Sequence, residues 1–291
     1  MIEIREVGVR DGLQNESTIL STEEKLVLIY KLMAAGVKKI EVASFVNPNL
    51  MPQMADAEAL IDMLPDGEDI EYSALVLSKS GLSRVLQTKI KHLQLSFAVT
   101  DGFNKKNINR TTEQSITEMI DIIGQAKTHN LTTNVILGTV FGCPYDGEVD
   151  LARVLQIATT LVEAGVDEIT FADTIGVANP NAITTVVQQF KVRHGDFPLG
   201  LHLHNTYGRG LANALAGLQQ GITRFDSSVG GIGGCPFAPR ATGNICTEDL
   251  VSMLHAMDYQ TPIDITSYIQ AAKWVEGKLG RTLDGMVMRT I

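Results

Sequence analysis

His202 and His204 lie two residues apart at the end of an apolar run, just before Asn205. Alternate side chains of a β-strand point to the same face, so a strand over residues 198–204 would present both imidazoles together at its carboxyl end. Two imidazoles presented in this way are typical of a pair of metal ligands. The alternative is that one or both histidines are packed, hydrogen-bonded residues. The position of the pair at a strand end favours the metal site.

The start of the chain supplies a matching carboxylate. Arg10, Asp11 and Gly12 follow a strand-like pattern over residues 2–7. Asp11 with two imidazoles suits a divalent cation that keeps open coordination positions. Because no cysteine pair accompanies this set, the residues favour Mg²⁺ or Mn²⁺ over structural zinc, although imidazole ligation leaves catalytic Zn²⁺ possible.

Arg10 and Asp11 are neighbours, and neighbouring strand residues face opposite ways. Both can reach one site only if the chain has left strand geometry there, which Gly12 makes plausible. A permanently charged arginine with several N–H donors is suited to stabilising an enolate oxygen. The alternative for Arg10 is an ordinary salt bridge.

Two further acids lie in apolar surroundings. Glu41 is inside a predicted strand over residues 38–45, where an unpaired carboxylate would be costly. It is therefore paired with an arginine, for which Arg10 is the candidate, or is an active-site acid, and the two are compatible. Asp173 follows a strand over 166–172 and is either a site residue or the cap of the next helix.

A glycine-rich segment, residues 230–244, contains Cys235. Such a segment can close over a ligand, and a cysteine in it can transfer a proton. It lacks the helix-opening Gly-x-Gly-x-x-Gly pattern, which argues against a dinucleotide site. Cys143 and Cys246 are expected to be packing residues.

The elements that must position these residues alternate regularly along the chain. The predicted strands cover residues 2–7, 38–45, 70–77, 91–98, 132–140, 166–172, 198–204 and 223–229. The predicted helices cover 22–35, 53–64, 79–87, 111–129, 150–164, 180–194, 207–220 and 247–257. Eight strand–helix units without a linker predict a single-domain α/β protein, a (β/α)₈ TIM barrel, with an open doubly wound sheet as the alternative.

The barrel is expected to take up about residues 1–258, and a short helical extension about 259–291, with one more helix near 264–278. That last helix would lie over the barrel or at a subunit contact. In such barrels the chemistry is at the carboxyl ends of the strands. The candidate residues obey this rule, so we expect them to surround one mouth although they are far apart in sequence.

Composition excludes several classes of partner. The formal net charge is −9 over 291 residues, which argues against nucleic acid and anionic membranes as partners. No apolar run approaches the roughly 20 residues needed to cross a bilayer, and the amino terminus enters a strand pattern without signal-peptide features. Three cysteines without paired spacing argue against a disulfide scaffold. We expect a protein of the reducing cytoplasm.

At these residues the chain resembles the 3-hydroxy-3-methylglutaryl-CoA (HMG-CoA) lyase family, within the wider group of metal-dependent barrel lyases and Claisen-type synthases. The resemblance covers nearly the whole chain and several of its motifs are characteristic of the lyases. They include Arg10-Asp11-Gly12-Leu13-Gln14, Glu41-Val42-Ala43-Ser44-Phe45, Gly142-Cys143-Pro144-Tyr145, Asp173-Thr174-Ile175-Gly176 and Gly233-Gly234-Cys235-Pro236.

The resemblance implies a homodimeric enzyme that cleaves a 3-hydroxyacyl-CoA, with HMG-CoA giving acetyl-CoA and acetoacetate. It implies that the cation is held by Asp11, His202, His204 and Asn244. It implies that Arg10 stabilises the enolate oxygen and that Cys235 takes part in proton transfer. The remaining implied site residues, catalytic or in contact with substrate, are Glu41, Asp173, Gln14 and Glu248.

The chain also departs from the family pattern. It has Asn205 where the lyases usually have aspartate, and Arg240 where a small residue is expected. Arg240 could bind an extra carboxylate or a CoA phosphate. A citramalyl-CoA or methylmalyl-type thioester is therefore an alternative substrate. An acetyl-CoA-dependent Claisen-type synthase is an alternative activity that the sequence favours less. A catalytically inactive barrel that binds acyl-CoA is the non-enzymatic alternative.

Overall fold

The computed structural model describes residues 1–67, 69–234 and 243–290. Eight parallel strands close into a barrel in chain order, with each strand paired to the next and β8 paired to β1. The strands are β1 (Glu3–Glu6), β2 (Lys39–Ser44), β3 (Glu71–Val76), β4 (His92–Ala98), β5 (Thr132–Gly138), β6 (Glu168–Asp173), β7 (Leu199–Leu203) and β8 (Arg224–Ser227). The TIM-barrel prediction is confirmed, and the open doubly wound sheet is wrong.

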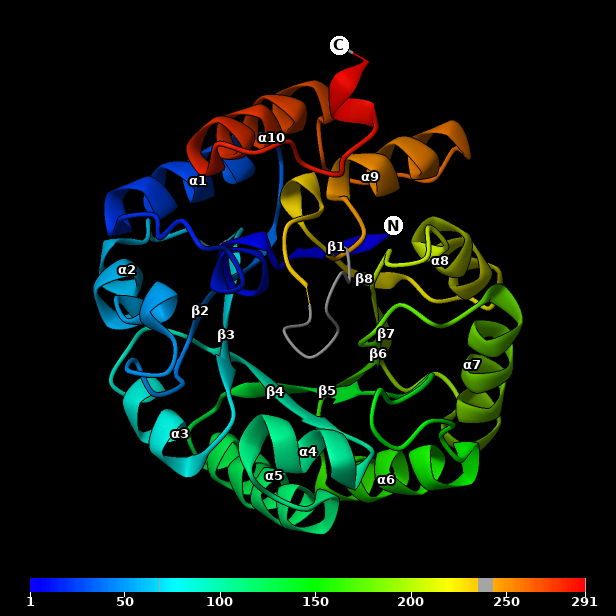
Figure 1. Ribbon diagram of the computed structural model, residues 1–291. Coiled ribbons are helices and arrows are strands. Elements are labelled where there is room, and N and C mark those ends of the chain that lie inside the picture. The colour runs from blue at the N-terminus through cyan, green and yellow to red at the C-terminus, as the bar shows by residue number, and fades with distance from the viewer. Residues whose placement is uncertain (68, 235–242, 291) are drawn as a thin grey trace.

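The helices form a ring around the strands, as Figure 1 shows. They are α1 (Thr22–Ala34), α2 (Ala57–Met63), α3 (Lys79–Val85), α4 (Asp101–Ile108), α5 (Thr112–Thr128), α6 (Leu151–Ala164), α7 (Pro180–His194), α8 (Gly210–Gln219), α9 (Thr247–Ala256) and α10 (Ile265–Leu279). Short-range signals set several of these starts. Ser21 closes a capping box with Glu24 before α1, and Asn179 caps α7, whose first residue is Pro180.

Large apolar side chains fill the layer between strands and helices. The inside of the barrel also holds polar groups that pair with one another. Asn134 on β5 donates to Gln94 Oε1 on β4 at 2.8 Å and to Thr170 Oγ1 on β6 at 2.9 Å. All three side chains are buried, so these hydrogen bonds offset the cost of removing them from water.

The structure contains one helix that was not predicted, and it shortens one predicted strand and divides one predicted helix. Helix α4 was not predicted, since its sequence is short, polar and without an apolar stripe. The strand predicted over 132–140 ends at Gly138 because Thr139 takes a positive φ of 59°. The helix predicted over 53–64 is divided into a 3₁₀ turn (Pro52–Met54) and α2.

Helix α10 follows the barrel and lies beside α1 and α9 (Figure 1). Lys278 Nζ on α10 is 2.8 Å from Glu24 Oε1 on α1. At the end of α1, Gly36 has a φ of +90°, and a Cβ there would lie 2.1 Å from the carbonyl oxygen of Pro262. The segment that leads into α10 is therefore seated on the barrel by a contact that only glycine permits.

Candidate active site at the barrel mouth

Arg10 and Asp11 lie on a single turn of π-helix (Gly8–Gly12) at the carboxyl end of β1. The amide N–H of Asp11 donates to the carbonyl oxygen of Val7 at 2.7 Å, which holds the turn closed. The prediction that the chain leaves strand geometry here is confirmed. Because the turn is not extended, two neighbouring side chains reach the same site, and they contact each other at 2.8 Å.

Both predicted histidines are buried at the end of β7 and face the same way. The Nε2 atoms of His202 and His204 are 3.2 Å apart, and His202 Nε2 is 4.0 Å from Asp11 Oδ2. One ligand atom from each of these three side chains lies within 4.8 Å of the other two. An oxygen and two imidazole nitrogens that converge in this way form a candidate site for a divalent cation.

Asn244 joins this cluster because its segment runs antiparallel to the end of β7, with Asn244 bridged to His204. Its Nδ2 donates to Asp11 Oδ2 at 2.8 Å and to the carbonyl oxygen of Ile232 at 3.2 Å. Its Oδ1 is buried and has no hydrogen-bond partner among the described residues. A buried amide oxygen left unpaired beside a carboxylate and two imidazoles fits a fourth cation ligand.

The start of the glycine-rich segment lies directly against these ligands. Gly233 has a φ of +123°, and a Cβ there would lie 2.6 Å from Asn244 Nδ2 and 3.5 Å from Asp11 Oδ2. The backbone at residue 233 therefore covers one side of the cluster, and glycine is required for this approach. Cys235 and Arg240, the predicted proton-transfer and substrate-binding residues of this segment, lie outside the described residues.

The electrostatics of the cluster suit cation binding by Asp11 and His204. Burial lowers the pKa of His202, but Asp226 and Asp11 outweigh burial and raise it, so a cation at its Nε2 must displace a proton. Burial raises the pKa of Asp11, but the charges of Arg10 and His202 outweigh burial and bring the pKa below its usual value. Burial and the charge of His202 lower the pKa of His204 to about 4. At neutral pH Asp11 is thus ionised and His204 is neutral, and these are the protonation states in which both bind a cation.

The pairing expected of Glu41 is confirmed. Arg10 Nη2 donates to Glu41 Oε2 at 2.7 Å, and both side chains are buried. The Nε of Arg10 is buried and has no partner in the part of the chain that the structure describes. Glu41 therefore orients the guanidinium and balances its charge, while the Nε donor of Arg10 has no partner among these residues.

The structure does not bring Asp173 into the cluster. Asp173 is paired in register with Leu203, so it faces the opposite side of the sheet from the two histidines. Its Oδ2 accepts the N–H of Ala178 at 3.0 Å, which organises the loop before α7. Burial raises its pKa to about 6, although the hydrogen bonds from that loop act to lower the pKa. The cap of α7 is Asn179, so the alternative of Asp173 as a helix cap is wrong.

The two predicted substrate contacts lie in different surroundings. Gln14 follows the π-helical turn and is half-buried, and its Oε1 has no partner among the described residues. Glu248, at the start of α9, is completely buried and accepts the N–H of Gly230 at 3.1 Å. Burial raises the pKa of Glu248 to about 8. Glu248 thus supports the turn behind the glycine-rich segment, and its contact with substrate stays a prediction.

Sequence reasoning missed two buried carboxylates. Asp226 on β8 contacts His202, with 3.2 Å between its Oδ2 and the imidazole Nδ1. Glu6 on β1 accepts four hydrogen bonds: from the N–H groups of Gly8 (2.8 Å) and Val229 (2.9 Å), and from the hydroxyls of Thr247 (2.8 Å) and Tyr268. The signal was available, because both acids lie in predicted strands where an unpaired carboxylate would be costly, as for Glu41.

Asn205, one of the departures from the family pattern, has a structural role. Its Oδ1 accepts the N–H of Gly210 at 3.0 Å, at the first residue of α8. An amide and a carboxylate can both accept this hydrogen bond. Cys143 and Cys246 are both buried, as expected of packing residues.

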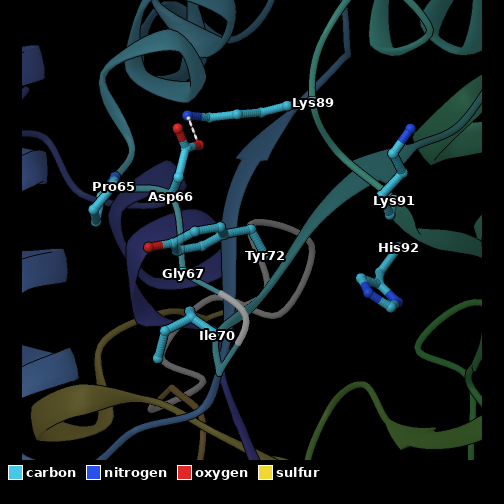
Figure 2. Close-up of a pocket in the computed structure, with 8 residues that line it drawn as sticks. All are labelled: Pro65, Asp66, Gly67, Ile70, Tyr72, Lys89, Lys91 and His92. Atoms are coloured by element: carbon cyan, nitrogen blue, oxygen red, sulfur yellow. Dashed lines mark hydrogen bonds and ion pairs between the residues drawn. The ribbon is translucent and has the colours of Figure 1, made fainter.

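A cavity at the other end of the barrel is shown in Figure 2. Tyr72 and His92, which line it, lie at the amino-terminal ends of β3 and β4. The candidate ligands lie at or just after the carboxyl ends of β1 and β7, so this cavity is separate from the cluster. Among the residues that the structure describes, none of the helices is both long and apolar enough to span a bilayer.

A closed parallel barrel with a carboxylate, two imidazoles and a clamped arginine at its carboxyl-terminal mouth has the fold and site of a metal-assisted barrel enzyme. Residues 1–275 match the HMGL-like family model, and the chain belongs to this family. It is thus an enzyme of the carbon–carbon lyase class, and the non-enzymatic alternative is not supported.

Two curated relatives are equally similar to the chain. A hydroxymethylglutaryl-CoA lyase of Bacillus subtilis is 40% identical over 282 residues, which covers 97% of this chain and 94% of the relative. An (R)-citramalyl-CoA lyase of Chloroflexus aurantiacus is 40% identical over 296 residues, which covers 98% of this chain and 93% of the relative.

Solved structures agree with this assignment. The crystal structure of the Bacillus subtilis HMG-CoA lyase has a TM-score of 0.96 at 39% identity, over 99% of this chain and 97% of that chain. An HMG-CoA lyase from Acinetobacter baumannii, solved in complex with coenzyme A and 3-methylmalate, has a TM-score of 0.95 at 35% identity, over 99% of this chain and 94% of that chain.

Proposed function

We propose that this chain is a divalent-metal-assisted lyase that cleaves HMG-CoA to acetyl-CoA and acetoacetate. The observation that carries the proposal is the convergence of Asp11, His202 and His204 on one point beside the clamped guanidinium of Arg10. The names of the relatives with 34–40% identity support the substrate.

We assign the cation to Asp11, His202, His204 and Asn244. Two oxygen ligands and two imidazoles favour Mg²⁺ or Mn²⁺, while Zn²⁺ also binds such a set. A divalent cation held there would polarise the 3-hydroxyl and the distal carboxylate of the substrate. Glu41 keeps Arg10 in place at 2.7 Å, so the side chains that meet the substrate are fixed before it arrives.

Arg10 is assigned to the thioester end of the substrate. When the C2–C3 bond breaks, its electron pair moves into C2 and onto the thioester oxygen, and the 3-hydroxyl loses its proton as C3 becomes a ketone. Arg10 stabilises the developing enolate oxygen, because its charge is permanent and its Nε has no partner among the described residues.

The proposal gives the other residues supporting roles that rest on sequence. Cys235 takes part in proton transfer to the enolate carbon, and Gln14 and Glu248 support substrate binding. Arg240 binds a carboxylate or a CoA phosphate. Asp173 acts by holding its loop through Ala178 N–H. We also propose a homodimer in the cytoplasm.

The assay uses the purified protein with Mg²⁺ or Mn²⁺ and (S)-HMG-CoA, and follows acetoacetate and acetyl-CoA. Metal-dependent formation of both products supports the proposal. The absence of both products from metal-loaded, folded protein contradicts the proposed substrate.

Citramalyl-CoA is the second candidate substrate, because a citramalyl-CoA lyase is as similar to the chain as the Bacillus enzyme. The same assay with (R)- and (S)-citramalyl-CoA would follow pyruvate and acetyl-CoA, and the ratio of kcat/KM values decides between the two substrates. A synthase would instead consume acetyl-CoA and a 2-oxo acid and release CoA.

A further inference from the structure

The second ring nitrogen of His202 is held by a carboxylate on the neighbouring strand. His202 on β7 and Asp226 on β8 are partners in the strand register, so their side chains project side by side into the barrel. His202 Nδ1 lies 3.2 Å from Asp226 Oδ2, while Nε2 faces His204 and Asp11. Both side chains are buried. The two nitrogens of one imidazole therefore have separate partners.

Asp226 is itself fixed by an arginine from β1. Arg5 and Asp226 are also register partners, and Arg5 Nη1 donates to Asp226 Oδ1 at 3.1 Å. The other end of the guanidinium donates to Glu168 Oε1 at 3.0 Å. The three strands β1, β8 and β7 thus carry Arg5, Asp226 and His202 at one level of the barrel. Within the described part of the chain each oxygen of Asp226 has one partner, so the carboxylate cannot rotate without losing a bond.

We propose that Asp226 is a positioning residue for the metal site. It accepts the Nδ1–H of His202 and thereby leaves the Nε2 lone pair directed at the cation, while Arg5 holds the Asp226 carboxylate in place. This inference rests on the proposed function, in which His202 is a cation ligand. Asp226 touches neither the substrate nor the cation and acts only through the imidazole.

The variant Asp226→Asn tests the inference at nearly constant volume. Arg5 has only donors, so the amide oxygen must face Arg5 and the amide NH₂ must face His202. The NH₂ group forces Nδ1 to become an acceptor, which moves the ring proton to Nε2 and blocks that ligand atom. We expect Mn²⁺ affinity, measured from the EPR signal of free Mn²⁺, to fall about 10–100-fold.

The matched control is Glu168→Gln, which removes a charge from the same Arg5 network without contact with His202. We expect its Mn²⁺ affinity to equal that of the unaltered protein. A purely structural network predicts a different pattern, in which both variants lower the melting temperature and neither changes Mn²⁺ affinity. That pattern would overturn the inference.

Two further measurements keep the interpretation unambiguous. If His202→Ala binds Mn²⁺ normally, the ligand assignment itself is wrong. If His202→Ala loses Mn²⁺ and folded Asp226→Asn does not, only the role of Asp226 is wrong.

A test without the Asn variant uses ¹⁵N-histidine NMR of the Mg²⁺-loaded protein. The His202 Nδ1–H, assigned by its loss in His202→Gln, should be protected from solvent exchange; exchange as fast as at exposed His129 would overturn the inference.

Discussion

Arg10 and Glu41 form a buried ion pair across the mouth of the barrel, with 2.7 Å between Nη2 and Oε2. The second Nη of Arg10 contacts Asp11 at 2.8 Å, so one guanidinium connects a candidate cation ligand to β2. The guanidinium of Arg10 is thus held at both of its Nη atoms. Its planar, forked geometry is available to arginine and not to lysine.

Arg10→Lys is therefore expected to lower kcat about 100–1,000-fold, the cost of removing a donor to a developing oxyanion. KM should change much less, because the contact strengthens as the enolate forms. Steady-state kinetics with HMG-CoA measures both quantities. The control is Arg84→Lys, which alters an ion pair with Glu58 between α3 and α2. An effect on KM alone would make Arg10 a substrate-binding residue without a role in the transition state.

Asn244→Ala tests the fourth proposed ligand. The change removes a buried amide oxygen without a partner among the described residues and also the hydrogen bond to Asp11. We expect Mn²⁺ affinity to fall at least about tenfold, because a ligand and its contact with a second ligand are lost together. Isothermal titration calorimetry gives the affinity, with exposed Asn181→Ala on α7 as the control. A lower melting temperature with unaltered Mn²⁺ affinity would exclude Asn244 as a ligand.

Glu248 makes stability depend on pH. Its carboxyl ionises near 4.5 in the unfolded chain, whereas burial raises its pKa to about 8 in the folded protein. The unfolded chain releases the proton first, so the free energy of unfolding falls as pH rises from about 4.5 to 8 and is level above that. The fall attributable to Glu248 is several kcal/mol, at about 1.4 kcal/mol per pKa unit.

Glu248→Gln keeps an oxygen for the Gly230 N–H and cannot ionise. We expect the variant to lose this part of the pH dependence and to exceed the original protein in stability at pH 8.5. Urea denaturation at pH 5 and pH 8.5 measures the difference. Exposed Glu148→Gln is the control. The same pH dependence in Glu248→Gln and the original chain would show that Glu248 is not the group responsible.

Gly36→Ala should destabilise the protein by about 2–4 kcal/mol, from a positive φ and a Cβ that overlaps the Pro262 carbonyl. Gly124→Ala is the matched control within α5, where no described atom outside its own helix lies within 4 Å of the new Cβ. It should stabilise the protein by about 0.5–1 kcal/mol. Thermal and urea unfolding of both variants measure these differences. Equal stability of the two variants would show that the segment before α10 can move away from Gly36.

The fold could be predicted because each strand–helix unit carries its own local signals, such as the Ser21 capping box and the proline at the start of α7. The cation cluster could be predicted because period-two spacing places His202 and His204 on one face and strand ends converge in a barrel. Both predictions need only local pattern and one rule of architecture.

The remaining site residues depend on contacts that no local pattern contains. Asp173 lies on the opposite face of the sheet from the two histidines, because the register of β6 pairs it with Leu203. Asp226 is recognisable as a partner of His202 only once β7 and β8 are aligned. Glu248 lies at the start of α9. That its side chain points inward and accepts the N–H of Gly230 can be seen only in the folded structure.

The four hydrogen bonds to Glu6 have a consequence for chimeric enzymes. One carboxylate joins the first strand to the segment after β8 and to helices α9 and α10. A chimera with its crossover between residues 8 and 229 takes the acceptor from one parent and the donors at Val229, Thr247 and Tyr268 from the other. In such recombinants the π-helical turn Gly8–Gly12, which carries Arg10 and Asp11, should keep its position only when both parents carry this acceptor and these donors. The first unit of the barrel and its last helix are therefore a single exchangeable module, although they are at opposite ends of the chain.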